Sequence, residues 1–253
     1  MHLREGTLED IPYVADIGCE ALWDDEIVQY LAPNRADYPR SHRDNYLYRT
    51  KKRFFAGDRL IVAVTEDEDE ARTGKETIAG FAFWSDTKGT SKPQPLPTSI
   101  LGNRFEQFVL RIEGTYRWYF NIDRSYNKLR FAKFWQVLSE NPFFEDITHH
   151  WELEVLAVHP AYQRQGLGST LLSWGMVQAS RHQLPVVVAA THNGKHLYRK
   201  HGFKECGRID LPDSAFSWTA MVRYPGQARP PDMDPSPWLS SVLCHTSFRC
   251  VDC

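Results

Sequence analysis

A run near the middle of the sequence, VHPAYQRQGLGSTLL at 158–172, carries residue types that bind phosphate groups. Gly166 and Gly168 stand two apart, after an apolar run typical of a strand and before a run typical of a helix. Glycines let backbone N–H groups approach a ligand, and the first turn of a helix favours an anion. Arg164 adds a positive charge and Ser169 a hydroxyl. The run therefore predicts an anion-binding loop.

Two common nucleotide-binding loops are excluded by their own requirements. A Walker loop needs G-x-x-x-x-G-K-[ST], and a dinucleotide fingerprint needs a third glycine with an acidic residue about twenty positions further on. Neither pattern occurs around this run. The anion must therefore belong to another kind of ligand.

The segment WELEV at 151–155 carries the residues that could move protons. As a strand, it would place Glu152 and Glu154 on one face and Trp151, Leu153 and Val155 on the other. Two carboxylates this close raise one another's pKa, so that one of them could accept a proton from an ammonium substrate. The pair would also attract a cationic amine. The alternative interpretation is a solvated strand face.

The N-terminal part supplies the elements that start the fold. A first strand is expected near Leu3, and the sequence TLED at 7–10 predicts the start of a helix. Segments 59–66 and 77–85 are rich in β-branched and aromatic residues, with an Asp-, Glu- and Gly-rich stretch between them. They predict an antiparallel pair of strands joined by a hairpin loop.

Residues 86–148 are expected to form an insertion. Its Pro- and Ser-rich start at 86–98 predicts no regular structure, whereas helical periodicity follows in the stretch up to 120 and again over about 128–140. The apolar side chains of the first helix either pack against the fold or cover an aromatic or apolar substrate. They are Phe105, Phe108, Val109, Ile112, Tyr116 and Tyr119.

The overall composition narrows the classes of function. The chain has 253 residues, 30 Lys and Arg, 32 Asp and Glu, and a formal net charge of −2, so no basic field favours nucleic acid or an anionic membrane. No apolar run of about 18 residues and no signal-peptide pattern is found. The five Cys do not form the framework of a secreted domain, so reduced thiols and a cytoplasmic protein are expected.

Histidine and cysteine residues do not favour a metal site. His149, His150 and His159 flank the strand that begins at 151, but adjacent residues on a strand point in opposite directions and have no companion at ligand spacing. The last residues resemble metal ligands in composition, yet follow a Pro-rich stretch and predict a flexible tail. These are Cys244, His245, Cys250 and Cys253. No metal is expected.

The loop resembles the acetyl-CoA signature of the GNAT superfamily of N-acetyltransferases, [RQ]-x-x-G-x-[GA], matched by QRQGLG at 163–168. The resemblance continues through HLYRKHGF at 196–203 and back to LREGTLEDIPYVADI at 3–17, but does not cover 86–148. It implies an α/β GNAT fold, with a mixed sheet of about seven strands flanked by helices. The insertion then lies between strands three and four of a single domain at 1–225, followed by a tail at 226–253.

The resemblance also implies acetyl-CoA as the cosubstrate, with its pantetheine arm between two splayed strands. The strand contacts carry over to Leu156, Ala157 and Val158. Asn193, before the next helix, is assigned to the same cosubstrate. The loop contacts carry over to Gln163, Arg164, Gln165, Gly166, Leu167, Gly168 and Ser169.

Catalytic roles carry over in the same way. Tyr198 stands where the family's general acid usually stands, five residues before Phe203, and its alternative role is packing. The histone-type branch has a Glu at the position of Glu152, and the arylalkylamine branch has His at the positions of Glu152 and Glu154. The later strand VVVAAT lacks the acid found in some N-terminal protein acetyltransferases, which argues against the ribosomal-protein type.

Together these features predict an enzyme that transfers an acetyl group to a primary amine of a small molecule, by direct transfer in a ternary complex. The resemblance favours an aromatic or apolar amine, because some acetyltransferases of the arylalkylamine type carry extra structure between the third and fourth strands, where this insertion is rich in Phe, Tyr and Trp. Two alternatives stay open: a protein or peptide acetyltransferase, and a non-catalytic CoA-binding module. The length of the acyl chain is also open. The expected partner is the amine, with no nucleic acid or membrane, in a monomer or homodimer.

Overall fold

The structure is a computed structural model that describes residues 1–66, 76–87, 89, 100–140, 144, 146–211 and 217–226. The expected hairpin loop, most of the Pro-rich start of the insertion and all but the first residue of the tail lie outside these residues. The helices are α1 (Ile11–Ala21), α2 (Glu26–Leu31), α3 (Pro39–Ala56), α4 (Ile100–Tyr119), α5 (Lys128–Glu140), α6 (Leu167–Arg181) and α7 (Lys195–Lys200). The strands are β1 (His2–Glu5), β2 (Arg59–Val64), β3 (Ile78–Asp86), β4 (Trp151–Val158), β5 (Val186–Ala190), β6 (Lys204–Asp210) and β7 (Ser217–Arg223).

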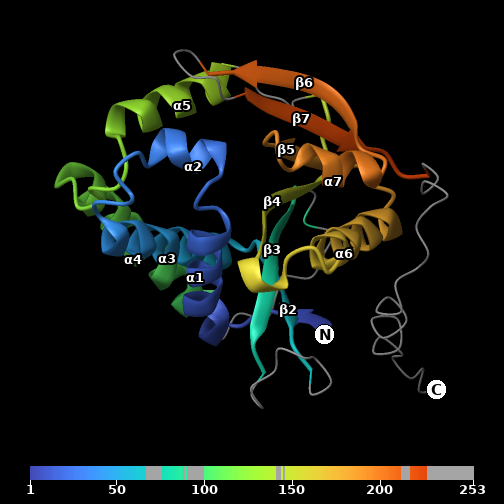
Figure 1. Cartoon of the computed structure of the whole chain (residues 1–253), viewed down its shortest axis with the longest axis horizontal. Coiled ribbons are helices and arrows are strands. Elements are labelled where there is room, and N and C mark those ends of the chain that lie inside the picture. Colours follow the sequence, from blue (N-terminus) through green and yellow to red (C-terminus); the bar gives the residue numbers. More distant parts are fainter. Residues whose placement is uncertain are drawn as a thin grey trace.

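The strands form one seven-stranded sheet in the order β1-β2-β3-β4-β5-β7-β6 (Figure 1). Every neighbouring pair is antiparallel except β4 and β5, which are parallel. The two helices α4 and α5 lie between β3 and β4 in the chain. The mixed sheet, the two inserted helices and their place between strands three and four confirm the expected fold.

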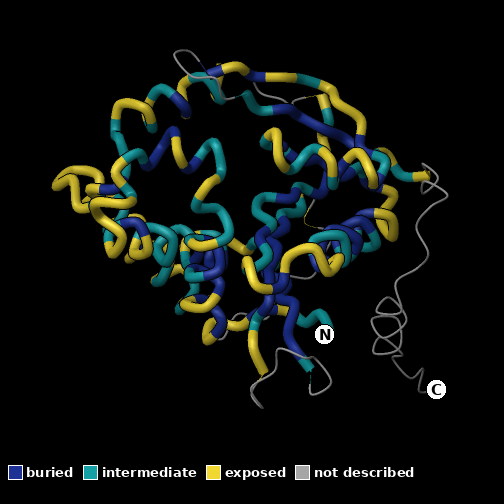
Figure 2. The backbone as a smooth tube through the Cα atoms, in the orientation of Figure 1, coloured by how far each residue is buried: buried dark blue, intermediate teal, exposed yellow. Residues whose placement is uncertain are grey.

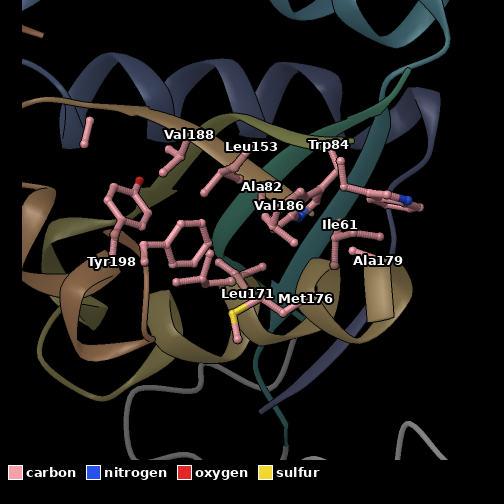
Figure 3. Packing of buried hydrophobic residues seen from close by; sticks show 14 of the residues in the cluster. Ile61, Ala82, Trp84, Leu153, Leu171, Met176, Ala179, Val186, Val188 and Tyr198 are labelled. Carbon is pink, nitrogen blue, oxygen red and sulfur yellow. The ribbon is translucent and has the colours of Figure 1, made fainter. Parts of the chain in front are cut away.

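Each face of the sheet is covered by its own helical layer. On one face α6 packs against the central strands through Leu171, Leu172 and Ala179, with Trp84 and Trp151 from the sheet (Figure 3). On the other face, α1 and α3 pack against Phe81, Phe83 and neighbouring strand residues. Figure 2 shows the strand β3 almost wholly buried between these layers. The central strands are therefore fixed from both sides.

A bulge in β4 changes the expected alternation of its side chains. Phe83 pairs with Val155 and Trp84 with Leu153, so Glu154 is an extra residue in β4. Trp151 and Leu153 pack on the α6 side as expected, but Val155 packs on the α1 and α3 side. The expectation that Val155 points away from the two glutamates was therefore wrong, because strict alternation does not continue through a bulge.

The inserted helices differ from each other in what they bury. Phe134 of α5 is buried with Tyr30 and Leu31 of α2 and lies 5.3 Å, ring to ring, from Trp218 of β7. On α4, Leu110 is buried against α3, whereas the predicted apolar face is exposed. Its six residues, Phe105, Phe108, Val109, Ile112, Tyr116 and Tyr119, are 39–79% exposed. The helix was predicted correctly, but neither predicted role for this face is confirmed, since the six side chains are exposed in the described part of the chain.

No described helix combines the length and the apolar character needed to cross a lipid bilayer.

His42 of α3 is a fully buried titratable side chain in the helical layer. It is enclosed by the rings of Trp23, Tyr46 and Tyr126, at centroid distances of 5.1–6.1 Å. Neither ring nitrogen has a hydrogen-bond partner among the described residues. Burial lowers the pKa of His42 to about 4, against an effect of the Asp123 charge that raises it. The imidazole is therefore neutral in the folded protein at neutral pH.

Replacing His42 with Phe should reduce the loss of stability at acidic pH. Between pH 6.5 and 4 the unfolded chain binds a proton on His42 that the folded chain does not, so acidification through this window lowers the free energy of unfolding, by about 3 kcal/mol for this group. Denaturant unfolding at several pH values, on the variant and the parent, measures the difference. Equal slopes of stability against pH in the two proteins would contradict the assignment.

Candidate functional site

The predicted anion loop connects β4 to α6 and is exposed (Figure 2). A short 3-10 turn at Pro160–Tyr162 follows His159, whose Nδ1 accepts a hydrogen bond from the Ala161 N–H at 3.2 Å. The Gln163 side chain donates to the Val158 carbonyl at 3.0 Å, which ties the loop to the end of β4. Arg164 is exposed and has a φ of 65°, an uncommon left-handed conformation for a residue with a side chain.

Gly166 is the position that needs a glycine. Its φ is 84°, and a Cβ there would meet no atom within 4 Å, so the space beside it is open. The first helical bond of α6 runs from the Thr170 N–H to the Gly166 carbonyl at 3.1 Å, so the amides at 167–169 are not used by the helix. These amides, the helix dipole and Arg164 fit a diphosphate.

Gly168 has a different environment from Gly166. A Cβ on Gly168 would lie 3.6 Å from Leu197 and 3.7 Å from Leu156, which is ordinary packing distance. The open approach that was predicted for both glycines is therefore found at Gly166 only. Ser169, whose hydroxyl was expected to help bind the anion, is half-buried in the first turn of α6.

Next to the loop, the parallel strands β4 and β5 diverge and leave an opening in the sheet. β4 and β5 pair at only three positions, the last joining Leu153 to Val188. Beyond it, Leu156, Ala157 and Val158 continue in β4 and pair, among the described strands, with β3 alone. Apart from the Val158 carbonyl, which accepts from Gln163, the backbone groups of this segment that face β5 have no partner among the described strands and are open to a ligand. Asn193 lies in the exposed turn before α7.

Tyr198 lies on the inner face of α7, at the edge of the core. Its ring is 8% exposed and packs against Phe203 at 5.8 Å, and in Figure 3 its hydroxyl points away from Leu171 and Met176. Burial, followed by the charge of Asp25, raises the pKa of the Tyr198 phenol well above its usual range. The phenol is therefore protonated at neutral pH and can donate a proton or a hydrogen bond.

Asp25, which the sequence reasoning missed, lies close to Tyr198. It caps α2 by accepting a hydrogen bond from the Ile27 N–H at 3.0 Å, and the Thr191 side chain also bonds to it. Burial raises the pKa of Asp25. An acidic residue before the apolar run EIVQYL is a cap signal, but nothing in the sequence connects it to Tyr198, since α2 and α7 are far apart in the chain.

Glu152 and Glu154 lie on the same side of β4, as predicted, but in different electrostatic environments. Arg53 of α3 donates to Glu154 at 2.6 Å and also lies 3.6 Å from Asp58. Ser85 adds a hydrogen bond to Glu154 at 3.4 Å. Glu152 is half-buried, and burial and then the charge of Glu154 raise its pKa to about 7. At neutral pH Glu152 is thus the carboxyl of the pair that exchanges a proton readily.

The histidines beside this strand have structural contacts. The ring of His150 is buried and bonds to the Ile147 carbonyl at 2.7 Å, with its other nitrogen 3.9 Å from Glu152. His159 contacts Glu20 of α1 at 3.1 Å. Within the described part of the chain no three His, Cys, Asp or Glu side chains gather as metal ligands. Cys244, His245, Cys250 and Cys253 lie outside that part.

Comparison with known proteins agrees with this geometry. The family model of the GNAT acetyltransferase domain matches residues 131–205, which include the splayed strand, the loop and Tyr198. The chain carries a GNAT acetyltransferase domain. Enzymes with a GNAT domain transfer an acyl group from CoA to an amine, and the chain is an N-acetyltransferase of this kind.

Alignments with several related proteins cover most of this chain. A protein of the fungus Stachybotrys chartarum described as an acetyltransferase is 25% identical over 213 residues, 83% of this chain and 84% of the relative. A Corynebacterium glutamicum structure, described as a histone acetyltransferase and related acetyltransferase, is 18% identical with a TM-score of 0.53, covering 90% of this chain and 97% of the other. A yellow fever mosquito structure, assigned as an arylalkylamine N-acetyltransferase, is 13% identical with a TM-score of 0.55, covering 88% and 86%. These two structures show the shared fold.

A Gly166→Trp substitution should weaken CoA binding at least tenfold, because the indole would fill the open space beside the loop amides. Gly226→Trp is the matched control, since Gly226 also has a positive φ, 80°, and open space, but follows β7. Titration calorimetry with CoA measures both variants. Equal affinities of Gly166→Trp and the control would sink the loop assignment.

Proposed function

We propose that this N-acetyltransferase moves an acetyl group from acetyl-CoA to the primary amine of a small molecule, by direct transfer while both substrates are bound. The proposal depends on the different protonation behaviour of Tyr198 and Glu152. Tyr198 is a buried phenol that stays protonated, whereas Glu152 is a carboxyl with a pKa of about 7. Such a pair provides an acid and a base at neutral pH.

The donor is held by backbone more than by side chains. The amides at 167–169 and the Arg164 side chain would bind its diphosphate, and the free edge of β4 at 154–158 would pair with the amides of its pantetheine arm. Gln163 and Gln165 would flank the diphosphate, and Asn193 before α7 would add a polar contact. A donor bound in this way would have its thioester near the bulge in β4, within reach of Glu152 and Tyr198.

The transfer needs two proton movements. A neutral amine attacks the thioester carbonyl, and its ammonium proton passes to the Glu152 carboxylate, directly or through water. Glu154 helps by raising the pKa of Glu152, while its own charge is held by Arg53. The C–S bond then breaks, and Tyr198 gives its proton to the departing thiolate of CoA. The amide and free CoA are the products.

The cysteines support direct transfer over a covalent acyl-enzyme. Burial raises the pKa of the Cys19 thiol to about 11, and burial also raises that of Cys206. A thiol in its protonated form is a poor nucleophile. Neither described cysteine is therefore prepared to accept the acetyl group, and the amine would attack the donor itself.

The enzyme's kcat/KM should rise with pH through about 7, because Glu152 must lose its proton before it can act as a base. Glu152→Gln should remove this rise and lower the rate at pH 8 by about a hundredfold. Glu113→Gln is the control, since Glu113 pairs with Arg117 on α4. Rates at saturating acetyl-CoA from pH 5.5 to 9 measure the profile. An unchanged profile in Glu152→Gln would remove this residue from the base role.

Tyr198→Phe should lower kcat about a hundredfold and leave the dissociation constant of CoA nearly unchanged, because the hydroxyl acts on the leaving group. Tyr30→Phe, another buried tyrosine, is the control. Thiol release from acetyl-CoA is measured with small amines and with a lysine-containing peptide. Turnover of the peptide alone would favour a protein acetyltransferase, and CoA binding without turnover of any acceptor would contradict the proposed function.

A further inference from the structure

One face of α3 carries a stripe of polar side chains, one end of which contacts the acidic strand β4. We call it the α3 stripe; its members, one helical turn apart, are His42, Tyr46, Arg49 and Arg53. At one end His42 contacts Trp23, between α1 and α2, and at the other end Arg53 contacts Glu154. The stripe therefore extends from the segment before α2 to the strand β4, which carries the two glutamates.

Arg49, in the middle of the α3 stripe, has no acidic partner among the residues that the structure describes. Its side chain is half-buried, and one Nη donates to the Tyr126 hydroxyl at 3.0 Å. Among the described residues no carboxylate lies within 4.0 Å of its guanidinium. Arg53, one turn away, has both Glu154 and Asp58 within this distance. The two arginines thus differ in how their charges are balanced.

Asp123, the acid whose charge acts on Arg49, is already used by other groups. Its carboxylate accepts hydrogen bonds from Ser41 at 3.0 Å, from the Ser125 hydroxyl at 2.6 Å and from Asn45. A guanidinium carries five N–H donors, and taking it out of water is unfavourable unless they are paired. Arg49 therefore has donors and charge available for a ligand.

The neighbours of Arg49 connect it with the reacting groups. The turn before it carries Tyr46, whose pKa is raised by burial and in part by the charge of Asp25. The same Asp25 charge acts on Tyr198. The turn after it carries Arg53, whose charge acts on Glu152 and which binds Glu154. Along α3, Arg49 thus lies between Tyr46, on which the charge near Tyr198 also acts, and Arg53, whose charge acts on Glu152.

We propose that the acceptor amine carries an anionic group, a carboxylate or a phosphate, and that Arg49 binds this group with help from the Tyr126 hydroxyl. The inference rests on the proposed function, because the same acceptor presents its amine to Glu152 and Tyr198. A guanidinium matches the oxygens of either anion with two parallel hydrogen bonds. Tyr126 belongs to the segment between α4 and α5, so the insertion contributes to acceptor choice through this segment.

The test compares acceptors that differ only in the anion. Three pairs vary its type and its distance from the amine: tyrosine with tyramine, 6-aminohexanoate with pentylamine, and O-phosphoethanolamine with ethanolamine. The values of kcat/KM, from thiol release at saturating acetyl-CoA, should favour the anionic member of at least one pair by about tenfold or more. The phosphate pair and the carboxylate pairs separate the two anions.

Arg49→Met should remove this preference by slowing the anionic member while leaving the neutral amine within about twofold. Arg43→Met is the matched control, since Arg43 lies on the outer face of the same helix and pairs with Asp16. Arg49→Lys and Tyr126→Phe serve as second variants that keep the positive charge, and both should reduce the preference only in part. Circular dichroism and melting temperature show that each variant is folded.

Three results would overturn the inference. They are equal or better turnover of the neutral member in every pair, an equal loss for both members in Arg49→Met, and an equal loss of preference in Arg43→Met. Turnover of neutral amines without preference would leave the proposed function standing. Without any turnover, binding decides: N-acetyltyrosine should bind the CoA complex more tightly than N-acetyltyramine, and lose this advantage in Arg49→Met, while equal affinities would again overturn the inference.

Discussion

The parallel pairing of β4 with β5, and its end after Leu153, is the constraint on which the site depends. Because β5 turns away, the second half of β4 keeps one edge without a strand, and the loop that follows places the start of α6 at the mouth of this opening. The bulge at Glu154 lies at the point where the two strands diverge. A donor bound along this edge would thus end at the side chains that the bulge positions.

The helical layer opposite α6, which contains α3, sets the electrostatic environment of Glu152 and Glu154. Glu152 and Glu154 differ by two positions in one strand, yet Arg53 contacts only Glu154. Glu152, which Arg53 does not contact, is half-buried beside the negative charge of Glu154, and both effects raise its pKa. α3 therefore gives two similar residues different environments. Glu154 is paired with Arg53, whereas Glu152 titrates near neutral pH.

Much of this arrangement follows from local patterns in the sequence. The loop is predicted by Gly166 and Arg164 before a helix, the sheet by alternating apolar runs, and the two inserted helices by their periodicity. Local patterns do not say what meets a given face, however. The face of α4 that carries the six predicted apolar residues has the period of a buried helix, but in the described part of the chain their side chains are exposed. Leu110 and Gln107 contact α3 instead, and Trp118 contacts Phe131 of α5. From the periodicity this face was expected to pack against the fold or to cover a substrate, but periodicity contains no information on tertiary partners.

Local sequence patterns predict the electrostatics of the site even less well than the packing of its helices. Arg53 and Glu154 are 101 residues apart in the chain, and Asp25 and Tyr198 belong to helices at opposite ends of it. Each pKa depends on desolvation and on charges within a few ångströms, which only the folded chain brings together. The residue types at 152, 154 and 198 therefore suggest the chemistry, whereas the proposed division into acid and base depends on distant helices. The same reasoning applies to Arg49: a charged residue on a helix is ordinary in the sequence, and it becomes informative only because its neighbours leave it without a carboxylate.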